Sequence, residues 1–313
     1  MSSWFHTLSP AAQGALRGVL LTITACALFS LLDSATKYAG MLLPMVMVVW
    51  MRFLAQALVT SALVLPRHGL KTFRTGHLKL QLIRAVAGFM TTVCAFFCIQ
   101  SMPLANFTAI WAAAPLFIVV ISALLFGERV SWPRWLLLIL GLIAVVAAAR
   151  PETAGQSLGW AALWPVGLLI CGISYQVIGS RLARLDPPAT TQMFTSWLPV
   201  LLTLPLVPLI WQPIPDWTLL VAAAVMGLCS GIGHLLLLHA FASTSPAIVS
   251  PFLYSQIGFA MLLGWLFFNQ VPDALSLTGM VVVTLCGLIS VWLGVREKPK
   301  EPAQNRAQDK LKV

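Results

Sequence analysis

Three ionisable residues, Asp33, Lys37 and Arg52, stand inside long apolar runs near the start of the chain. An ionised side chain in the middle of a membrane helix costs roughly 2.5–3.5 kcal/mol on insertion scales, so such residues are paired, hydrated or functional. Asp33 and Lys37 are four residues apart, which places them on one helix face. One acid and two bases leave a net charge of +1. This charge suits recognition of a carboxylate, a phosphate or another anionic group.

The sequence leaves three interpretations of these charges open. In the first, Asp33 and Arg52 form an ion pair that holds two helices together, and Lys37 snorkels to the outer surface. In the second, the three side chains contact a substrate directly. In the third, Asp33 carries a proton across a membrane cavity.

Other polar and aromatic side chains in the apolar runs supply hydrogen bonds and flat walls of the kind that line ligand cavities. We expect six of them to share a substrate-binding cavity with the three charged residues: Trp111, Tyr175, Gln176, His234, Tyr254 and Gln256.

The sequence predicts no metal site and no cofactor. His234 and His239 are five residues apart, hence about 140° around a helix, so they do not face one metal. The six cysteines all lie in apolar runs, and none forms a Cys-x-x-Cys pair. We expect them to be packing residues.

Enzyme signatures are absent from the sequence. It has no His-Glu-x-x-His, no Gly-x-x-x-x-Gly-Lys-Ser/Thr and no Gly-x-Ser-x-Gly. The sequence therefore predicts no catalytic residues and no ATP hydrolysis. The alternatives that we keep are an integral membrane enzyme acting on a lipid-linked substrate, and a scaffold or receptor without substrate flux.

The composition is that of an integral membrane protein. Hydrophobic residues make up 59% of the 313 residues and charged residues 9%, and the mean hydropathy is +0.90. Soluble chains carry about 25% charged residues. We expect an all-α integral membrane protein with ten transmembrane helices, at 16–39, 43–65, 81–101, 104–126, 132–149, 159–181, 189–211, 217–242, 246–268 and 274–295.

The basic residues are distributed unevenly between the two sides of this arrangement. Sixteen of the 19 lie in residues 1–17, 66–84, 127–134 and 181–184 and in the tail, whereas Arg150 alone lies on the opposite side. By the positive-inside rule both termini are cytoplasmic. The net charge of +10 is thus a mark of topology and of contact with lipid head groups, and it does not indicate nucleic acid.

The chain resembles itself at a distance of about half its length. Ser101 to Arg129 is similar to Ser243 to Val271 at an offset of 142 residues, and Lys37 and Pro44 match Arg181 and Pro188 at 144. Five spans in each copy mean that the second copy enters the membrane from the opposite side, as in inverted-repeat transporters. We expect a leader at 1–14, repeats at 15–150 and 158–295, and a disordered basic cytoplasmic tail at 296–313.

Several motifs in both halves together resemble a known family. They are Lys37…Pro44…Arg52, Ser101-Met-Pro-Leu-Ala105, Ala114-Pro115-Leu116, Phe126-Gly127-Glu128-Arg129, Arg181…Pro187-Pro188 and Ala247. In these residues the chain resembles an EamA-type member of the drug/metabolite transporter superfamily over about 15–295. It departs from the pattern at Phe29-Ser30, where Trp-Gly is usual, and at Asn269-Gln270, where Gly-Glu is expected.

The resemblance implies two inverted five-helix repeats around a central cavity with alternating access. It implies a secondary transporter of small polar organic metabolites such as amino acids or nucleotide-like compounds, working as an exporter in the inner membrane. Its partners are then the metabolite and membrane lipids. The sequence leaves open whether protons are coupled and whether the protein is a monomer or a homodimer.

Overall fold

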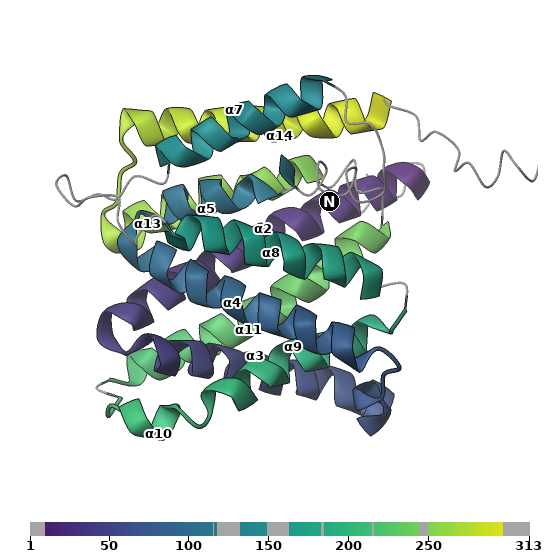
Figure 1. The fold of residues 1–313 in the computed structure, drawn as a ribbon, viewed down its shortest axis with the longest axis vertical. Coiled ribbons are helices and arrows are strands. Elements are labelled where there is room, and N and C mark those ends of the chain that lie inside the picture. The colour runs from purple at the N-terminus through teal and green to yellow at the C-terminus, as the bar shows by residue number, and fades with distance from the viewer. Residues whose placement is uncertain are drawn as a thin grey trace, which may run out of the picture.

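A computed structural model describes residues 10–114, 116–117, 132–148, 163–182, 185–214, 216–243 and 250–296. Within these ranges the regular structure is helical, without strands. The helices are α2 (Pro10–Leu42), α3 (Met45–His68), η1 (Gly69–Phe73), α4 (Leu78–Ser101), α5 (Leu104–Ala112), α7 (Trp132–Ala148), α8 (Leu163–Leu182), α9 (Pro188–Thr203), α10 (Val207–Ile210), α11 (Trp217–Ser243), η3 (Ser250–Tyr254), α13 (Ser255–Phe268) and α14 (Ala274–Arg296). Figure 1 shows them lying side by side, with their ends gathered at two opposite faces of a bundle.

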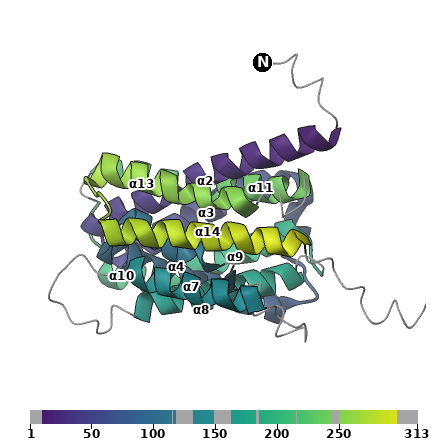
Figure 2. The same ribbon diagram turned by 90° about the horizontal axis from the view of Figure 1, so that it is seen from above.

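Among the described residues, four helical stretches are long and apolar enough to cross a membrane. They are Gln13–Leu42, Met45–Phe73, Leu78–Ser101 and Trp217–Leu237. Shorter apolar helical stretches cover Trp135–Ala144, Leu163–Gly179, Phe252–Phe268 and Ala274–Ser290. Helix α2 is longer than the predicted 16–39, and its N-terminal end projects from the bundle (Figure 2). The chain is therefore a helical, multi-pass membrane protein.

Prolines set the starts of three helices. Pro44, Pro103 and Pro187 each occupy the position before the first helical residue, with φ near −58° and ψ near 145°. Proline has no backbone N–H to leave unpaired at a helix start, and its ring fixes the φ angle there. The helices α3, α5 and α9 begin within two residues of the predicted positions because of these prolines.

The predicted span 189–211 is not one continuous helix. Helix α9 ends at Thr203, and the short α10 follows from Val207 to Ile210. Pro205 and Pro208 lack the N–H groups that would continue the α-helical hydrogen bonds. The backbone tightens into a turn instead, in which the Leu206 N–H donates to the Thr203 carbonyl over 3.0 Å.

Helix α13 ends in a left-handed turn at the pair that departs from the family pattern. Asn269 has φ 52° and ψ 31°, and the Gln270 N–H donates to the Gly264 carbonyl over 3.0 Å. Asparagine adopts this conformation more readily than most residues. The Gln270 side chain accepts a 3.3 Å hydrogen bond from the Leu104 N–H, in the first turn of α5. Gln270 thus connects two helices that lie far apart in sequence.

The helices pack in pairs across the middle of the sequence. Helix α2 packs on α11, α4 on α8, α3 on α9, α5 on α13 and α7 on α14. One buried apolar cluster joins α4, α5, α7, α8, α13 and α14, and another joins α2, α3, α4 and α11. The space between these clusters contains the site described next.

Some sequence predictions fall outside the described residues. These include Pro115, Glu128, Arg150 and most of the leader and the tail.

Candidate functional site

A cavity of about 320 Å³ lies between the helices, at mid-length of α2, α3, α4, α8 and α11. Residues of α5, α9, η3 and α13 complete its wall. Eight of the nine predicted substrate-binding residues line it: Asp33, Arg52, Trp111, Tyr175, Gln176, His234, Tyr254 and Gln256. The ninth, Lys37, does not.

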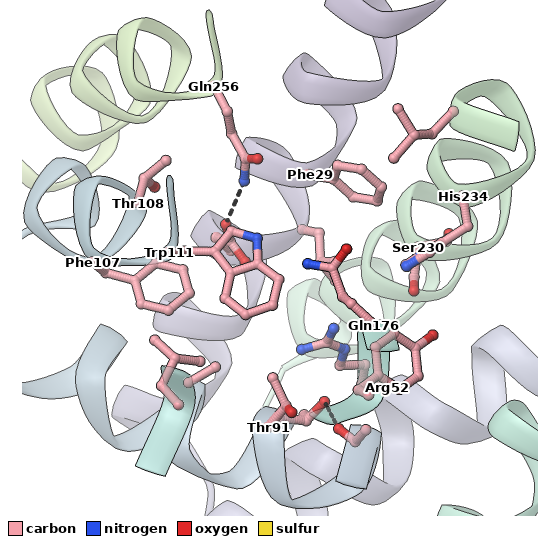
Figure 3. A pocket seen from close by; sticks show the side chains of 18 of the residues that line it. Phe29, Arg52, Thr91, Phe107, Thr108, Trp111, Gln176, Ser230, His234 and Gln256 are labelled. Atoms are coloured by element: carbon pink, nitrogen blue, oxygen red, sulfur yellow. Dashed lines mark hydrogen bonds between the residues drawn. The ribbon is translucent and has the colours of Figure 1, made fainter. Parts of the chain in front are cut away.

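Aromatic side chains form much of the cavity wall. Figure 3 shows Trp111 and Phe107 on one side, and Phe29 and His234 on the other. The indole of Trp111 packs directly over Gly172 of α8, where a Cβ atom would lie 2.3 Å from its Cζ3. Glycine at this position therefore determines how far the indole can approach α8.

Asp33 and Arg52 both line the cavity but do not pair with each other. Asp33 is 8% exposed, and its Oδ2 accepts a 3.4 Å hydrogen bond from Gln256 Nε2, drawn in Figure 3. Arg52 Nε is buried without a hydrogen-bond partner. Although both residues belong to the described part of the chain, no salt bridge joins them. The ion-pair interpretation is therefore not supported, and the cavity presents one acidic and one basic group separately.

Lys37 has a structural position at the end of α4. It is 4% exposed, and its Nζ donates to the carbonyls of Ile99 (2.6 Å) and Met102 (2.8 Å). The last carbonyls of a helix lack intrahelical partners and carry partial negative charge, which a cation stabilises. The expectation that Lys37 lines the cavity is thus not met, because this helix end holds its amino group. Its burial also excludes snorkelling to the surface.

His234 is fixed by its own helix. Its Nδ1 lies 2.7 Å from the Ser230 carbonyl, and its ring meets Phe29 edge-on at 5.0 Å. Since a carbonyl only accepts, Nδ1 carries the proton, and Nε2 of the neutral ring remains as an acceptor. His239 is exposed and bonds to Leu235, so the two histidines act separately.

Tyr175 and Tyr254 are held by packing rather than by their hydroxyl groups. The guanidinium of Arg84 lies over the Tyr175 ring at 4.0 Å. The Tyr254 hydroxyl is buried without a partner and packs on Gly287, where a Cβ atom would lie 1.6 Å from its oxygen.

The sequence-based prediction missed a polar network beside the cavity. Gln56 and Ser230 line the cavity, and Ser230 Oγ donates to Gln56 Oε1 over 2.8 Å. Gln56 Nε2 donates to Ser196 Oγ over 3.4 Å, and Ser196 Oγ donates to Thr60 over 3.4 Å. This network joins α3, α9 and α11. Gln56 could have been predicted from the sequence, because an amide side chain is unusual in an apolar helix. The Ser and Thr members could not, because hydroxyl groups in helices often bond only to their own backbone.

Within the described ranges, no group of three or more His, Cys, Asp or Glu side chains gathers where a metal could bind. The cavity therefore offers binding groups, namely hydrogen-bond donors and acceptors, aromatic faces and two opposite charges.

Comparisons with known proteins give a consistent result. The model of the EamA-like transporter family matches residues 16–150. The chain is 31% identical over 277 residues to the pseudopaline exporter CntI of Pseudomonas aeruginosa (strain UCBPP-PA14), covering 86% of this chain and 93% of the relative. It is 28% identical over 291 residues to a riboflavin transporter of Vibrio cholerae, covering 88% and 94%. It is 21% identical over 260 residues to an S-adenosylmethionine uptake transporter of Rickettsia conorii, covering 83% and 87%.

A solved structure titled "Crystal structure of protein" shares the fold. It superposes with a TM-score of 0.63 at 19% sequence identity, and the match covers 90% of this chain and 98% of that chain.

Proposed function

The chain belongs to the EamA-like transporter family of the drug/metabolite transporter superfamily, and from this we propose that it is a secondary transporter of a small polar organic metabolite. Its relatives are named as transporters and not as enzymes. The alternative of an enzyme acting on lipid-linked substrates is therefore set aside. The proposed mechanism is alternating access around the cavity.

The packing of the helices supports two inverted five-helix repeats, at 15–150 and 158–295. The first helix of each unit packs on the third helix of the other, as α2 does on α11 and α8 on α4. The second, fourth and fifth helices each pack on their own counterparts, in the pairs α3 with α9, α5 with α13 and α7 with α14. Exchanging the two units leaves this set of contacts unchanged, as a pseudo-two-fold axis requires.

The observation that carries the substrate proposal is the separation of Asp33 from Arg52 in one cavity. A buried, unpaired ion is costly, so each gains from an opposite charge on a bound solute. With Lys37 held at the end of α4, the described residues that line the cavity include one charge of each sign, Asp33 and Arg52. This arrangement favours a zwitterionic solute, such as an amino acid, over a purely anionic one.

The other lining residues suit the remainder of such a solute. Trp111 provides a flat surface, while Gln176, His234 and Gln256 provide hydrogen bonds. Tyr175 and Tyr254 add further aromatic surface to the wall. Nucleotide-like compounds also combine a flat ring with charged groups, so they remain among the small polar metabolites that we propose as substrates. Proton coupling through Asp33 is the alternative role of that carboxyl group.

We further propose export, with both termini in the cytoplasm and the protein in the inner membrane. The basic residues support this orientation by the positive-inside rule. The relative that is 31% identical is named as an exporter, although two others are an uptake transporter and a riboflavin transporter. A monomer and a homodimer are both compatible with this mechanism.

Proteoliposomes test the function directly. Purified protein is reconstituted, and uptake of labelled amino acids, riboflavin and S-adenosylmethionine is compared with that of protein-free liposomes. We expect saturable, protein-dependent uptake of a zwitterion. If no organic solute enters faster than in empty liposomes, the transport proposal fails.

A further inference from the structure

Asp186, between α8 and α9, is the centre of a hydrogen-bonded group at the end of the bundle that carries η1, here called the basic end. Thr75 Oγ1 and Gln81 Nε2 donate to Asp186 Oδ2 over 2.5 and 2.7 Å. His77 Nδ1 lies 3.3 Å from Oδ1. These four residues are the Asp186 clasp.

The clasp is shielded at its carboxylate and its amide but open at the imidazole. The Asp186 side chain is 7% exposed and Gln81 is 1% exposed, whereas the His77 side chain is 40% exposed. Gln81 Nε2 also donates to Thr191 Oγ1 over 3.1 Å, in the first turn of α9. Hydrogen bonds to an ionised acceptor are among the stronger ones in proteins. The clasp therefore ties the segment before α4 to the start of α9.

A second contact lies between the clasp and the cavity. Along α4, Gln81 belongs to the clasp, Arg84 follows one turn later, and Gly88 belongs to the cavity wall. The Arg84 guanidinium stacks on Tyr175, and its Nη1 donates to Thr195 Oγ1. Tyr175 and Thr195 both line the cavity. Arg84 thus joins α4, α8 and α9 between the cavity and the basic end.

The opposite end of the bundle is joined more weakly at the matching place. Thr218 lies 143 residues after Thr75, within one residue of the repeat offset, and its hydroxyl is 2.9 Å from Tyr38 Oη in an exposed hydrogen bond. Asp216 is exposed, and among the described residues its carboxylate accepts a hydrogen bond only from Thr218, over 3.1 Å. Leu42 stands where the 144-residue offset would place a match for Asp186. Within the described residues, the basic end therefore has a multiply bonded carboxylate that the opposite end lacks.

We propose that the Asp186 clasp is the latch of the inner gate, which must release before the cavity opens toward the cytoplasm. This proposal rests on the proposed transport function and on the cytoplasmic position of the basic end. Alternating access requires helices to separate at one end of the bundle while the other end closes, and at the basic end the clasp joins α4 to α9. In this structure, the clasp and Arg84 oppose that separation at the basic end.

The test measures access to the cavity without any substrate. Thr91 lines the cavity on α4, and its hydroxyl bonds only to its own helix, so Thr91→Cys is a suitable reporter. Its labelling by a membrane-impermeant maleimide is measured in inside-out and right-side-out vesicles, with protein lacking this cysteine as background. We expect Asp186→Ala to speed labelling from the cytoplasmic face about tenfold, since hydrogen bonds to a charged group shift a two-state equilibrium by at least that much.

Two further variants keep the result interpretable. Thr75→Val removes one donor while keeping the carboxylate, and it should raise labelling in the same direction by a smaller factor. Asp216→Ala, at the opposite end, should leave cytoplasmic labelling unchanged. Thermal unfolding and gel filtration identify variants that fail to fold.

The outcomes separate the two proposals. The latch proposal is overturned if the folded Asp186→Ala and Thr75→Val variants are labelled from the cytoplasmic face at the rate of the protein that carries Thr91→Cys alone. It is also overturned if labelling speeds up only from the outer face. Uptake by wild-type proteoliposomes is scored independently, so an unchanged labelling rate with intact transport leaves the proposed function standing.

Discussion

Asp33 on α2 and Arg52 on α3 line the same cavity, yet no salt bridge connects their side chains, both of which lie in the described part of the chain. Gln256 bonds the carboxylate, and the guanidinium Nε has no partner. A solute with both signs of charge can therefore satisfy both groups at once.

The first prediction concerns these two charges. Arg52→Gln should lower kcat/KM for a zwitterion about 10- to 150-fold, because a hydrogen bond to a charged group contributes about 1.5–3 kcal/mol. Asp33→Asn should do the same and should penalise a cationic analogue more than an anionic one. Initial uptake rates in proteoliposomes measure both. Equal rates for well-folded variants and wild type would remove these residues from the site.

The second prediction concerns Lys37, whose substitution should affect folding and leave the affinity for solute unchanged. Lys37→Met leaves the carbonyls of Ile99 and Met102 without their donor, at a cost of about 1–3 kcal/mol. The melting temperature should fall while KM stays constant. Lys79 is exposed in the first turn of α4, at the end of that helix next to η1. Lys79→Met removes a lysine without such contacts and is the matched control. A raised KM with unchanged stability would instead place Lys37 in the substrate site.

The third prediction uses the close approach of Trp111 to α8. Gly172→Ala places a methyl group 2.3 Å from the present position of Cζ3, so the indole must move. We expect KM to change with little loss of stability, because only the far edge of the ring has to shift. The effect should not add to that of Trp111→Ala, since both changes act on the same ring. Gly258→Ala, with open space around it, is the control. Fully additive effects of Gly172→Ala and Trp111→Ala on KM would contradict the proposed contact between the indole and α8.

The fourth prediction concerns acid. Burial raises the pKa of Asp186, but hydrogen bonds from Thr75, Gln81 and His77 outweigh that effect and hold the pKa below its ordinary value of 3.8. A carboxyl group with a lowered pKa in the folded state stabilises the fold when it is ionised. Its contribution is present above pH 3.8 and is lost as the pH falls through the lowered pKa. Thermal unfolding is measured as the pH is lowered through this range. The melting temperature of the wild type should fall more than that of Asp186→Asn. Parallel curves would contradict it.

Hydropathy and proline positions were sufficient to place most of the helices. The breaks at Pro205 and Pro208 were visible in the sequence, but an apolar run does not reveal whether a kinked helix continues or stops. The structure also explains Gln270, which was a departure from the family pattern by sequence alone. Its side chain accepts from the Leu104 N–H, a partner 166 residues away.

The cavity residues were predictable where the side chain was unusual for a membrane helix, as with Asp33, Arg52 and Gln256. Lys37 shows the limit of that reasoning. An intramembrane charge indicates that a partner exists, but only the tertiary structure shows that the partner is the end of α4. The Asp186 clasp was missed because its residues look like ordinary connection residues until the two connections are brought together.

The most direct test of the account compares three forms of one solute in wild-type proteoliposomes. Uptake of phenylalanine, a zwitterion, is measured beside its cationic amide and its anionic N-acetyl derivative. We predict that the zwitterion enters at least about tenfold faster than either, because each derivative leaves one buried charge of the cavity unmatched. Uptake of either singly charged form at the rate of the zwitterion or above it would contradict recognition of both charges of the solute by Asp33 and Arg52.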